Sequence, residues 1–460
     1  MPGFEDEWPD IQGNILRPYA HPHARYAIVR IDQAEGARRL LASLLDQQLI
    51  TTAAPWAPDE KPEATLNVYF SWHGLAAIRV PQPSLDSFPE EFRQGMAARW
   101  QRLHDPDPAG WEFGGNPDQT HVFFAVYGNT AANVEAQLDK LRAELAKVAG
   151  AVTVTHRQDA AMLARHTEHF GFADGFGQPQ IADSGAPKYR GDGTPVDADG
   201  WAPIATGEFI IGHPNETGLP GPSPLPDALG RNGSFMAYRK IEQDVPAFRA
   251  FLRGEAARLY GSAAPENVEL LAAKLVGRWR SGCPLALSPQ RDDPALAEKW
   301  GANNDFRYAT DPRGAVCPLG SHIRRMNPRD GLPADTATLV RTHRIVRRGL
   351  PYGDWLDEGN VEGDGKPRGI AFMAVNASLA YQFELVHEDW TNSGEFAGLD
   401  AQDVDPFSGE PREGSRFRIP QASGLAKRIF NLPRFTTLRG GGYFFIPSMT
   451  ALRFIAGKPS

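Results

Sequence analysis

An aspartate in the stretch HFGFADGFGQPQI (169–181) has the type and setting of a group that moves protons. Asp174 stands among aromatic and small residues, namely Phe170, Phe172, Phe176, Gly171, Gly175 and Gly177. The glycines allow the chain to fold tightly, while a carboxylate among phenylalanines loses hydration unless a neighbour needs its charge or its proton. Two interpretations follow. The spacing alone favours a turn whose aspartate caps local N–H groups, and the alternative is an acid/base group on a stiff loop over a pocket.

A second candidate is His322, in the segment CPLGSHIRRMNPRD (317–330). An isolated histidine is usually an ordinary surface residue near a loop. Here a proline and a glycine precede it, and Arg324 and Arg325 follow it. A histidine on a tight loop beside guanidinium groups suits a porphyrin, because the imidazole can ligate iron and an arginine can pair with a propionate.

Two further arginines, Arg347 and Arg348, are adjacent in the strand-like stretch RIVRRGLPYG (344–353). Neighbouring side chains of a strand point to opposite faces, so one of the two can face inward. A buried arginine without a charged partner is costly, and inside a pocket it would need Asp174 or an anionic ligand. For Arg348 a solvated position at a strand end is the competing interpretation.

Two other patterns carry less weight. His166 and His169 have a spacing that can place two imidazoles on one helical face, but the sequence offers no third metal ligand beside them. The glycines of GFADGFG lack the Lys-Ser/Thr of a phosphate-binding loop and the spacing of a dinucleotide-binding loop. No stretch resembles a nucleophile elbow.

Regular elements that could position these residues begin with two copies of a strand–helix–strand unit. Helical spacing of apolar residues predicts helices over 33–48 and 131–148. Strands are predicted at 24–31, 66–72, 121–127 and 151–157. The order β-α-β-β-α-β is the ferredoxin-like arrangement, which states a fold and no function.

A second α+β unit is predicted after two Gly/Pro-rich connections at 183–207 and 215–233. Its predicted strands are 208–213, 343–349, 369–375 and 441–447, and its predicted helices are 244–260, 265–278 and 377–390. A chain of 460 residues exceeds the usual size of a single core, so two domains are expected.

Composition excludes several classes of function. A net charge of −8 argues against a surface for nucleic acid or anionic membranes. No stretch has the length of a membrane span, and the acidic opening MPGFEDEWPD resembles neither a signal peptide nor a twin-arginine segment. Cys283 and Cys317 cannot form a disulfide framework or a thiolate cage. These features predict a cytoplasmic location.

Taken together, these stretches resemble the dye-decolourising peroxidases. GFADG (171–175) resembles that family's G-x-x-D-G signature, CPLGSHIRRMNPR (317–329) its segment with the haem histidine, and IVRRGLPYG (345–353) its segment with the distal arginine. Further similar segments are DIQGNIL (10–16), GEFIIGHPNE (207–216), GIAFMAVNASLAYQFELVHEDWTN (369–392) and LRGGGYFFIPS (438–448). Length and insertions resemble the larger members of the family.

The resemblance implies an α+β fold of two ferredoxin-like domains with antiparallel sheets, of the dimeric α+β barrel type. Residues 1–200 would form the domain that supplies the GFADG loop, and residues 201–460 the domain that holds most of a haem b. The implied function is a haem peroxidase that reduces hydrogen peroxide and oxidises bulky aromatic, phenolic or dye substrates one electron at a time. No nucleic-acid or membrane partner is expected.

The resemblance also implies roles for individual residues. Asp174 would shuttle a proton between the two oxygens of the peroxide, and Arg347 would stabilise the negative charge that develops there. His322 would ligate the iron, with its second ring nitrogen bonded to a carboxylate, for which Asp405 is the first candidate and Asp403 the second.

The resemblance implies further contacts with the cofactor. Arg324 would bind a propionate, Ile370 and Phe372 would form the apolar distal wall, and Gly175 would lie next to Asp174 at the cofactor. Three positions depart from common family patterns, namely Gly349, His213 and Gly442. Two other classes of function stay open: a protein that stores, carries or processes haem with little turnover, and an iron-free structural α+β protein.

Overall fold

Alternating strands and amphipathic helices build the N-terminal half of the chain. The computed structural model describes residues 3–57, 59–197, 200–333, 337–393 and 396–458. Its first half contains β1 (His23–Ile31), α2 (Ala34–Asp46), β2 (Ala64–Phe70), β3 (Val122–Gly128), α6 (Ala131–Ala146) and β4 (Val152–Ala161). The expected β-α-β-β-α-β order is therefore present, with α3 (Trp72–Ala77), α4 (Gln82–Asp86) and α5 (Glu90–Ala98) inserted between β2 and β3.

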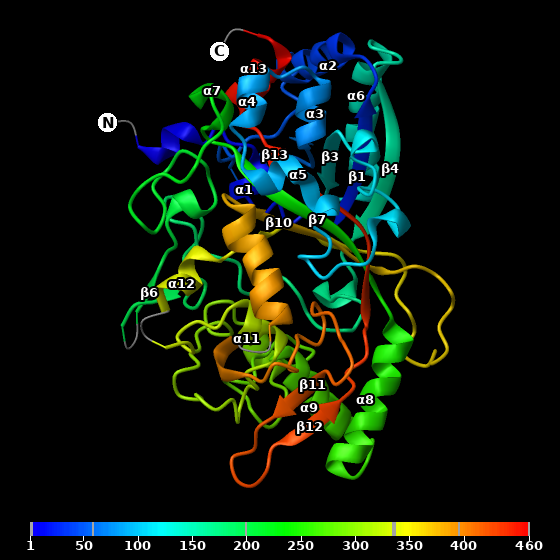
Figure 1. The fold of residues 1–460 in the computed structure, drawn as a ribbon, viewed down its shortest axis with the longest axis vertical. Helices are drawn as coiled ribbons and strands as arrows, with labels where there is room; N and C mark the ends of the chain where they lie inside the picture. Colours follow the sequence, from blue (N-terminus) through cyan, green and yellow to red (C-terminus); the bar gives the residue numbers. More distant parts are fainter. Residues whose placement is uncertain (1–2, 58, 198–199, 334–336, 394–395, 459–460) are drawn as a thin grey trace.

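The C-terminal half repeats the same kind of unit with longer insertions. Its strands are β7 (Ser234–Gln243), β8 (Val346–Arg347), β9 (Leu350–Tyr352), β10 (Gly369–Asn376) and β13 (Thr436–Ile446). Its longer helices are α8 (Val245–Tyr260), α9 (Pro265–Val276) and α13 (Met449–Ala456), and α11 (His322–Met326) is a single short turn. A hairpin of β11 (Arg416–Ile419) and β12 (Lys427–Phe430) lies beside α8 and α9 at the lower end of the molecule (Figure 1).

One antiparallel sheet joins the two halves. Its strand order is β4-β1-β3-β2-β13-β7-β10-β8, and β9 also pairs with β10. The halves meet where Phe70 of β2 pairs with Phe445 of β13. Buried Gln12 reinforces this junction, because its Nε2 donates to Val68 O (2.8 Å) and Pro447 O (2.9 Å). The antiparallel pairing confirms the expected α+β class.

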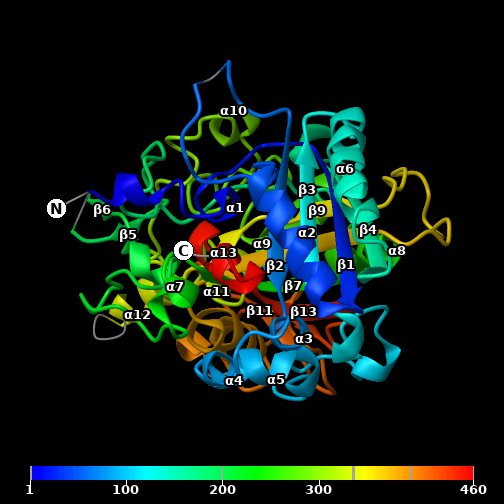
Figure 2. The same cartoon turned by 90° about the horizontal axis from the view of Figure 1, so that it is seen from above.

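Apolar residues fill both faces of this sheet. Helices α2, α6 and α13 cover one face, as the view from above shows (Figure 2), and α2 buries Leu40, Leu41, Leu44 and Leu45 there. The sheet curls toward its other face, because β4 and β9 are in contact although they stand near opposite ends of the strand order. Its interior is aromatic: the ring of Phe123 stacks on Tyr26 and Tyr69 and meets Tyr238 edge to face.

Several expected elements differ from the structure. The stretch 208–213, predicted as a strand, is a buried turn after the short 3-10 segment Thr206–Glu208, and Gly212 adopts φ +87° there. An apolar run alone does not distinguish a buried turn from a strand. The strand β7 was not predicted, because charged Arg239 and Lys240 interrupt its apolar pattern.

Two elements next to the candidate residues also differ. The strand predicted at 343–349 is reduced to the short strand β8, and β9 follows it outside the predicted range. The helix predicted at 377–390 consists of two π-helical segments, Leu379–Glu384 and Val386–Thr391, drawn as the orange helix between β10 and α11 (Figure 1). π-Helical turns are rare and are frequently found at functional sites. Among the described residues, no helix combines the length and apolar character needed to cross a membrane.

Candidate active site

A cavity of about 360 Å³ collects most of the residues singled out in the sequence. Its walls come from the segment 168–177, the strands β7 and β10, helix α11 and the π-helical segments. Apolar side chains line much of it, among them Val276, Met326, Ile370, Phe372, Phe383 and Leu438. Charged and polar side chains lie among these apolar ones, and a cavity of this volume with both kinds of wall is typical of a small-molecule or cofactor site.

His322 opens α11 and faces this cavity. Its Nδ1 lies 3.0 Å from Asp405 Oδ2 and 3.1 Å from Oδ1. Burial by itself would raise the pKa of the Asp405 carboxyl, but the charge and hydrogen bond of His322, with the Ser408 N–H, outweigh it and lower that pKa. A carboxylate accepts, so Nδ1 carries the proton and the lone pair of Nε2 is directed to the cavity.

The partner of His322 is thus Asp405 in this structure, and Asp403 is not in contact with the imidazole. Asp405 is fully buried, and its Oδ1 also accepts from the N–H groups of Phe407 (2.9 Å) and Ser408 (2.7 Å). These bonds fix the carboxylate, and the carboxylate fixes the imidazole. Such a partner sets both the tautomer and the ring orientation of a metal-binding histidine.

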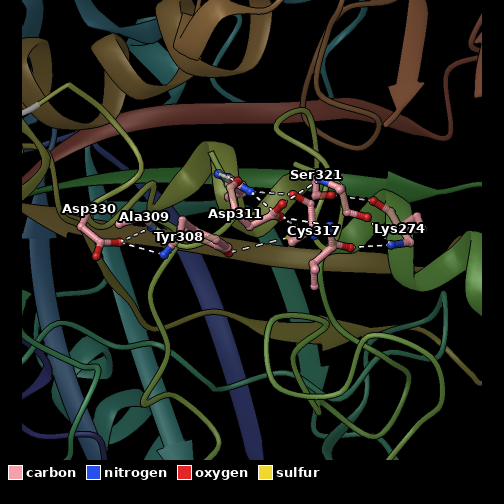
Figure 3. Close-up of polar contacts among 10 residues, drawn as sticks. Lys274, Tyr308, Ala309, Asp311, Cys317, Ser321 and Asp330 are labelled. Carbon is pink, nitrogen blue, oxygen red and sulfur yellow. Dashed lines mark hydrogen bonds and ion pairs between the residues drawn. The ribbon is translucent and has the colours of Figure 1, made fainter. Parts of the chain in front are cut away.

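A network of backbone caps holds the loop that leads to His322. The Asp311 carboxylate accepts from the N–H groups of Ala315 (2.7 Å), Val316 (3.2 Å) and Cys317 (2.9 Å). Ser321, the residue before His322, donates through Oγ to Lys274 O of α9 (2.6 Å), as Figure 3 shows. At the other end Asp330 Oδ1 accepts from Tyr308 N (2.7 Å). The loop is therefore tied to α9 on one side and to residues 308–311 on the other.

The two arginines that follow His322 in α11 hold this helix in place by side-chain hydrogen bonds. Arg325 is fully buried and donates to Trp390 O (2.5 Å) and Asp403 O (2.8 Å), which joins α11 to the second π-helical segment. Arg324 does not line the cavity. Its guanidinium donates to Asp311 Oδ2 (3.1 Å) and to Cys317 O (2.7 Å), and it lies over the ring of Tyr308. The expected contact of Arg324 with a propionate therefore does not fit this structure, because the guanidinium is held away from the cavity.

The loop around Asp174 faces the cavity from another side. Phe170 and Phe172 are buried, and Gly171 and Gly175 adopt φ +95° and +96°, a backbone conformation that favours glycine. Asp174 N donates to His166 O (2.9 Å), and Gly175 N donates to Asp174 Oδ1 (2.6 Å). The carboxylate does cap a local N–H group, but it also stands at the cavity wall, whereas Gly175 does not line the cavity.

Arg347 meets Asp174 across the two halves of the chain. Its Nη1 lies 3.0 Å from Asp174 Oδ1, and its Nη2 donates to Phe176 O (2.7 Å). Burial by itself would raise the pKa of Asp174, but the charge and hydrogen bond of Arg347, together with the Gly175 N–H and His322, outweigh it, so that pKa lies below its usual range. The side chain of Asp174 nevertheless keeps 47% of its accessible surface, because it faces the open cavity.

Arg348 points the other way and is not a solvated strand-end residue. It donates to Asn14 O (2.8 Å) and Ile15 O (3.2 Å), and burial lowers its pKa to about 10. Gly349 follows at the cavity wall, where an added Cβ would lie 2.1 Å from Ala371 O. A side chain at this position would require the backbone to move.

Four buried arginines at the cavity were not predicted from the sequence, of which Arg239 pairs with Asp105 and the other three have no such partner. Arg278, Arg329 and Arg344 are 7%, 4% and 4% exposed, and none has a carboxylate within 4 Å in the part of the chain that the structure describes. Burial, followed by the charge of Arg329, lowers the pKa of Arg278 to about 10 and that of Arg344 to about 9. Two sequence signals were available, because Arg344 lies three residues before Arg347 and Arg329 ends the segment 317–329 that contains His322.

The two histidines considered as a metal pair are separated from this site. His169 is buried and its Nε2 lies 2.8 Å from Tyr352 O, whereas His166 is exposed, and neither lines the cavity. Within the described ranges, no group of three His, Cys, Asp or Glu side chains could hold a metal ion.

Comparison with known proteins points in one direction. The family model described as the DyP dimeric alpha+beta barrel domain matches residues 10–162. A dye-decolorizing peroxidase of Mycena epipterygia is 30% identical, over 97% of this chain and 86% of that protein. An ancestral D-type dye decolorizing peroxidase superimposes with a TM-score of 0.84 at 28% identity, covering 97% of this chain and 98% of that one. A dye-decolorizing peroxidase in complex with 2,6-dimethoxyphenol gives a TM-score of 0.83 at 25% identity, over 98% and 99% of the two chains.

Proposed function

Because this chain belongs to the dye-decolorizing peroxidase family, it is a haem peroxidase, and we propose that the cavity between His322 and Asp174 is its active site. It oxidises dyes and phenols, and a structurally similar member of the family has been observed in complex with 2,6-dimethoxyphenol. We further propose hydrogen peroxide as the oxidant and bulky aromatic compounds as the reductants. Residues 1–200 and 201–460 are the two domains proposed, and the cytoplasm is the proposed compartment.

The residues present fit a haem. Nε2 of His322 has no hydrogen-bond partner among the described residues and faces apolar walls that suit a flat macrocycle. Arg278, Arg329 and Arg344 carry buried charge that calls for an anion, which the propionates supply. The described lining contains no cysteine, so the proposal is haem b held without thioether bonds. His322 would ligate the iron, and Arg329 and Arg344 take the role expected of Arg324.

Bound haem would supply an iron that accepts oxidising equivalents from the peroxide and passes them on one electron at a time. The chain supplies the proton chemistry. Asp174 is deprotonated over a wide pH range because Arg347 lowers its pKa. Its Oδ1 is engaged by Arg347 and by the N–H of Gly175, so Oδ2 is the atom that takes a proton from the inner peroxide oxygen and returns it to the outer one.

Arg347 contributes a fixed positive charge. Its Nη2 is held by Phe176 O and its Nη1 by Asp174, so the guanidinium is oriented before the peroxide arrives. A preorganised cation stabilises negative charge that develops on the oxygens at little cost in reorganisation. Where His322 lines the cavity, Asp405 accepts the hydrogen bond from Nδ1, and such a partner would make Nε2 a stronger ligand for the iron.

The observation that carries the proposal is the placement of the Asp174–Arg347 pair and of His322 on the walls of one cavity. Mere haem storage requires His322 but not that pair.

The test is haem titration and 2,6-dimethoxyphenol oxidation by the wild type, by His322→Ala and by the control His166→Ala, whose imidazole lies outside the cavity. We expect His322→Ala to lose the histidine-ligated haem spectrum and turnover, and His166→Ala to keep both. A normal spectrum in His322→Ala would contradict the proposed ligand.

A further inference from the structure

The edge of strand β8 is completed by a side chain instead of another strand. Val346 and Arg347 pair with β10, and the neighbouring Arg348 N donates to Met373 O of that strand. In antiparallel pairing the N–H and C=O of alternate residues point to opposite sides, so those of Arg347 point away from β10. There they meet Gln178: Arg347 N donates to Gln178 Oε1 (3.1 Å), and Gln178 Nε2 donates to Arg347 O (3.2 Å).

Gln178 belongs to the same loop as Asp174, four residues further along. The loop also accepts from the Arg347 side chain, through Asp174 Oδ1 at 3.0 Å and Phe176 O at 2.7 Å. The backbone and the guanidinium of Arg347 are thus both held by the segment 174–178. Arg344 adds a third contact between the same two segments, since its Nη2 donates to Gly177 O (3.1 Å), but Gln178 alone holds the backbone of Arg347.

We propose that Gln178 is a positioning residue for the reaction with peroxide: its side-chain amide sets where Arg347 stands relative to Asp174. The inference rests on the proposed function of that pair. A primary amide is suited to the task, because it offers one acceptor and two donors and so pairs with a backbone N–H and C=O together. Carboxylates lack the donor and apolar side chains lack both groups.

The placement matters for two physical reasons. A displacement of about 1 Å at a reacting group can cost about a hundredfold in rate. The same displacement would also weaken the effect of Arg347 on the pKa of Asp174. In the haem-free chain the charges that lower this pKa are Arg347 and His322. With Nε2 of His322 on iron the imidazole is neutral, so Arg347 is the charge that remains, and a looser Arg347 lets burial raise the pKa.

The test compares Gln178→Leu with Gln180→Leu in the haem-loaded protein. Gln180 lies in the same segment, takes part in its fold through backbone bonds to Asp192 O and from Ile204 N, and forms no side-chain hydrogen bond with the described residues. We expect Gln178→Leu to lower the rate constant for hydrogen peroxide by about tenfold to a hundredfold. The acid limb of its pH–rate profile should move to higher pH, because a carboxylate with a higher pKa loses its negative form earlier as pH falls. Gln180→Leu should match the wild type in both measurements.

A second measurement does not depend on activity. Hydrogen–deuterium exchange of peptides covering residues 344–350 should be faster in Gln178→Leu than in Gln180→Leu, since the Arg347 N–H loses its acceptor. Gln178→Met, which keeps the length of glutamine, replaces the leucine variant if that protein does not fold. The inference would be overturned if the Gln178 variant matched the wild type in all three measurements: the rate constant for peroxide, the acid limb of the pH–rate profile and the exchange of residues 344–350. The Asp174→Asn variant tests the proposed function separately. If this variant reacts slowly with hydrogen peroxide, the proposed function of the Asp174–Arg347 pair stands, and if it reacts at the wild-type rate, that function is contradicted.

Discussion

At the scale of single residues, three buried arginines of the cavity, Arg278, Arg329 and Arg344, form no ion pair with the described acidic side chains. Arg329 is 4% exposed and donates to Asn304 O (2.9 Å) and Phe306 O (2.9 Å), which are neutral acceptors. Asp192 is near enough to interact electrostatically, but burial raises its pKa despite Asn304 and the arginines. An anionic group of the cofactor would therefore find unsatisfied positive charge here.

We predict that Arg329→Met lowers haem affinity by about tenfold to a hundredfold, the value of one or two charge-assisted hydrogen bonds. Arg324→Met should instead lower the free energy of unfolding, because Arg324 is paired with Asp311 outside the cavity. The control is Arg313→Met, an exposed residue of the same region. Haem titration followed by absorbance checks the affinities, and an unchanged affinity in Arg329→Met would remove this arginine from the cofactor site.

At the scale of elements, the loop before α11 determines where His322 stands. The Asp311 carboxylate satisfies the N–H groups of Ala315, Val316 and Cys317. We predict that Asp311→Ala lowers the free energy of unfolding by about 2–3 kcal/mol, because buried donors lose their acceptor. Asp139→Ala on α6 removes only an exposed ion pair and should change it by less than about 0.5 kcal/mol. Urea unfolding of the haem-free proteins measures the unfolding free energy of both variants. An equal loss in the two variants would contradict the stabilising role of the Asp311 caps.

Some of the elements and site residues could be predicted from the sequence, and others could not. The helices over 244–260 and 265–278 are close to the observed α8 and α9, because helical spacing and the flanking glycines are local signals. The partner of His322 could be named, yet its alternative Asp403 differs from Asp405 by two residues, and only the fold separates them. Arg278 joins the site through long-range packing around Asn304, which no local pattern reveals. Arg329 lies in the quoted segment 317–329, but its contact with Asn304 also depends on the fold. The π-helical form of 379–391 likewise depends on the surroundings of the cavity.

At the scale of the whole molecule, buried titratable groups outside the site make stability depend on pH. Burial lowers the pKa of His169 to about 4, and that imidazole is 1% exposed. The unfolded chain binds a proton near pH 6.5 that the folded chain does not bind until about pH 4. The contribution of His169 to stability is therefore present above pH 6.5 and is lost as pH falls toward 4. Glu208 acts in the opposite sense, since burial raises its pKa to about 7 and its ionisation opposes folding as pH rises.

We predict that His169→Gln removes up to about 3 kcal/mol of the loss in unfolding free energy between pH 7 and pH 4, the value of a pKa difference of this size. Glutamine keeps a donor for Tyr352 O and has no proton to gain. Urea unfolding at both pH values, with the wild type and the variant compared at each, isolates the histidine from Glu208. A pH dependence equal to that of the wild type would assign the acid sensitivity to other groups.

The central claim is that Asp174, held by Arg347 at the cavity wall, moves the proton in the reaction with hydrogen peroxide. Stopped-flow measurement of that reaction in haem-loaded Asp174→Asn tests it most directly, with Asp139→Asn on α6 as the control. Asparagine keeps the shape and cannot take the proton, so we predict unchanged haem binding and a rate constant for peroxide lower by about 10²–10⁴-fold. The control should react at the wild-type rate. A wild-type rate in Asp174→Asn would contradict the account and leave Asp174 as a residue that only caps its own loop.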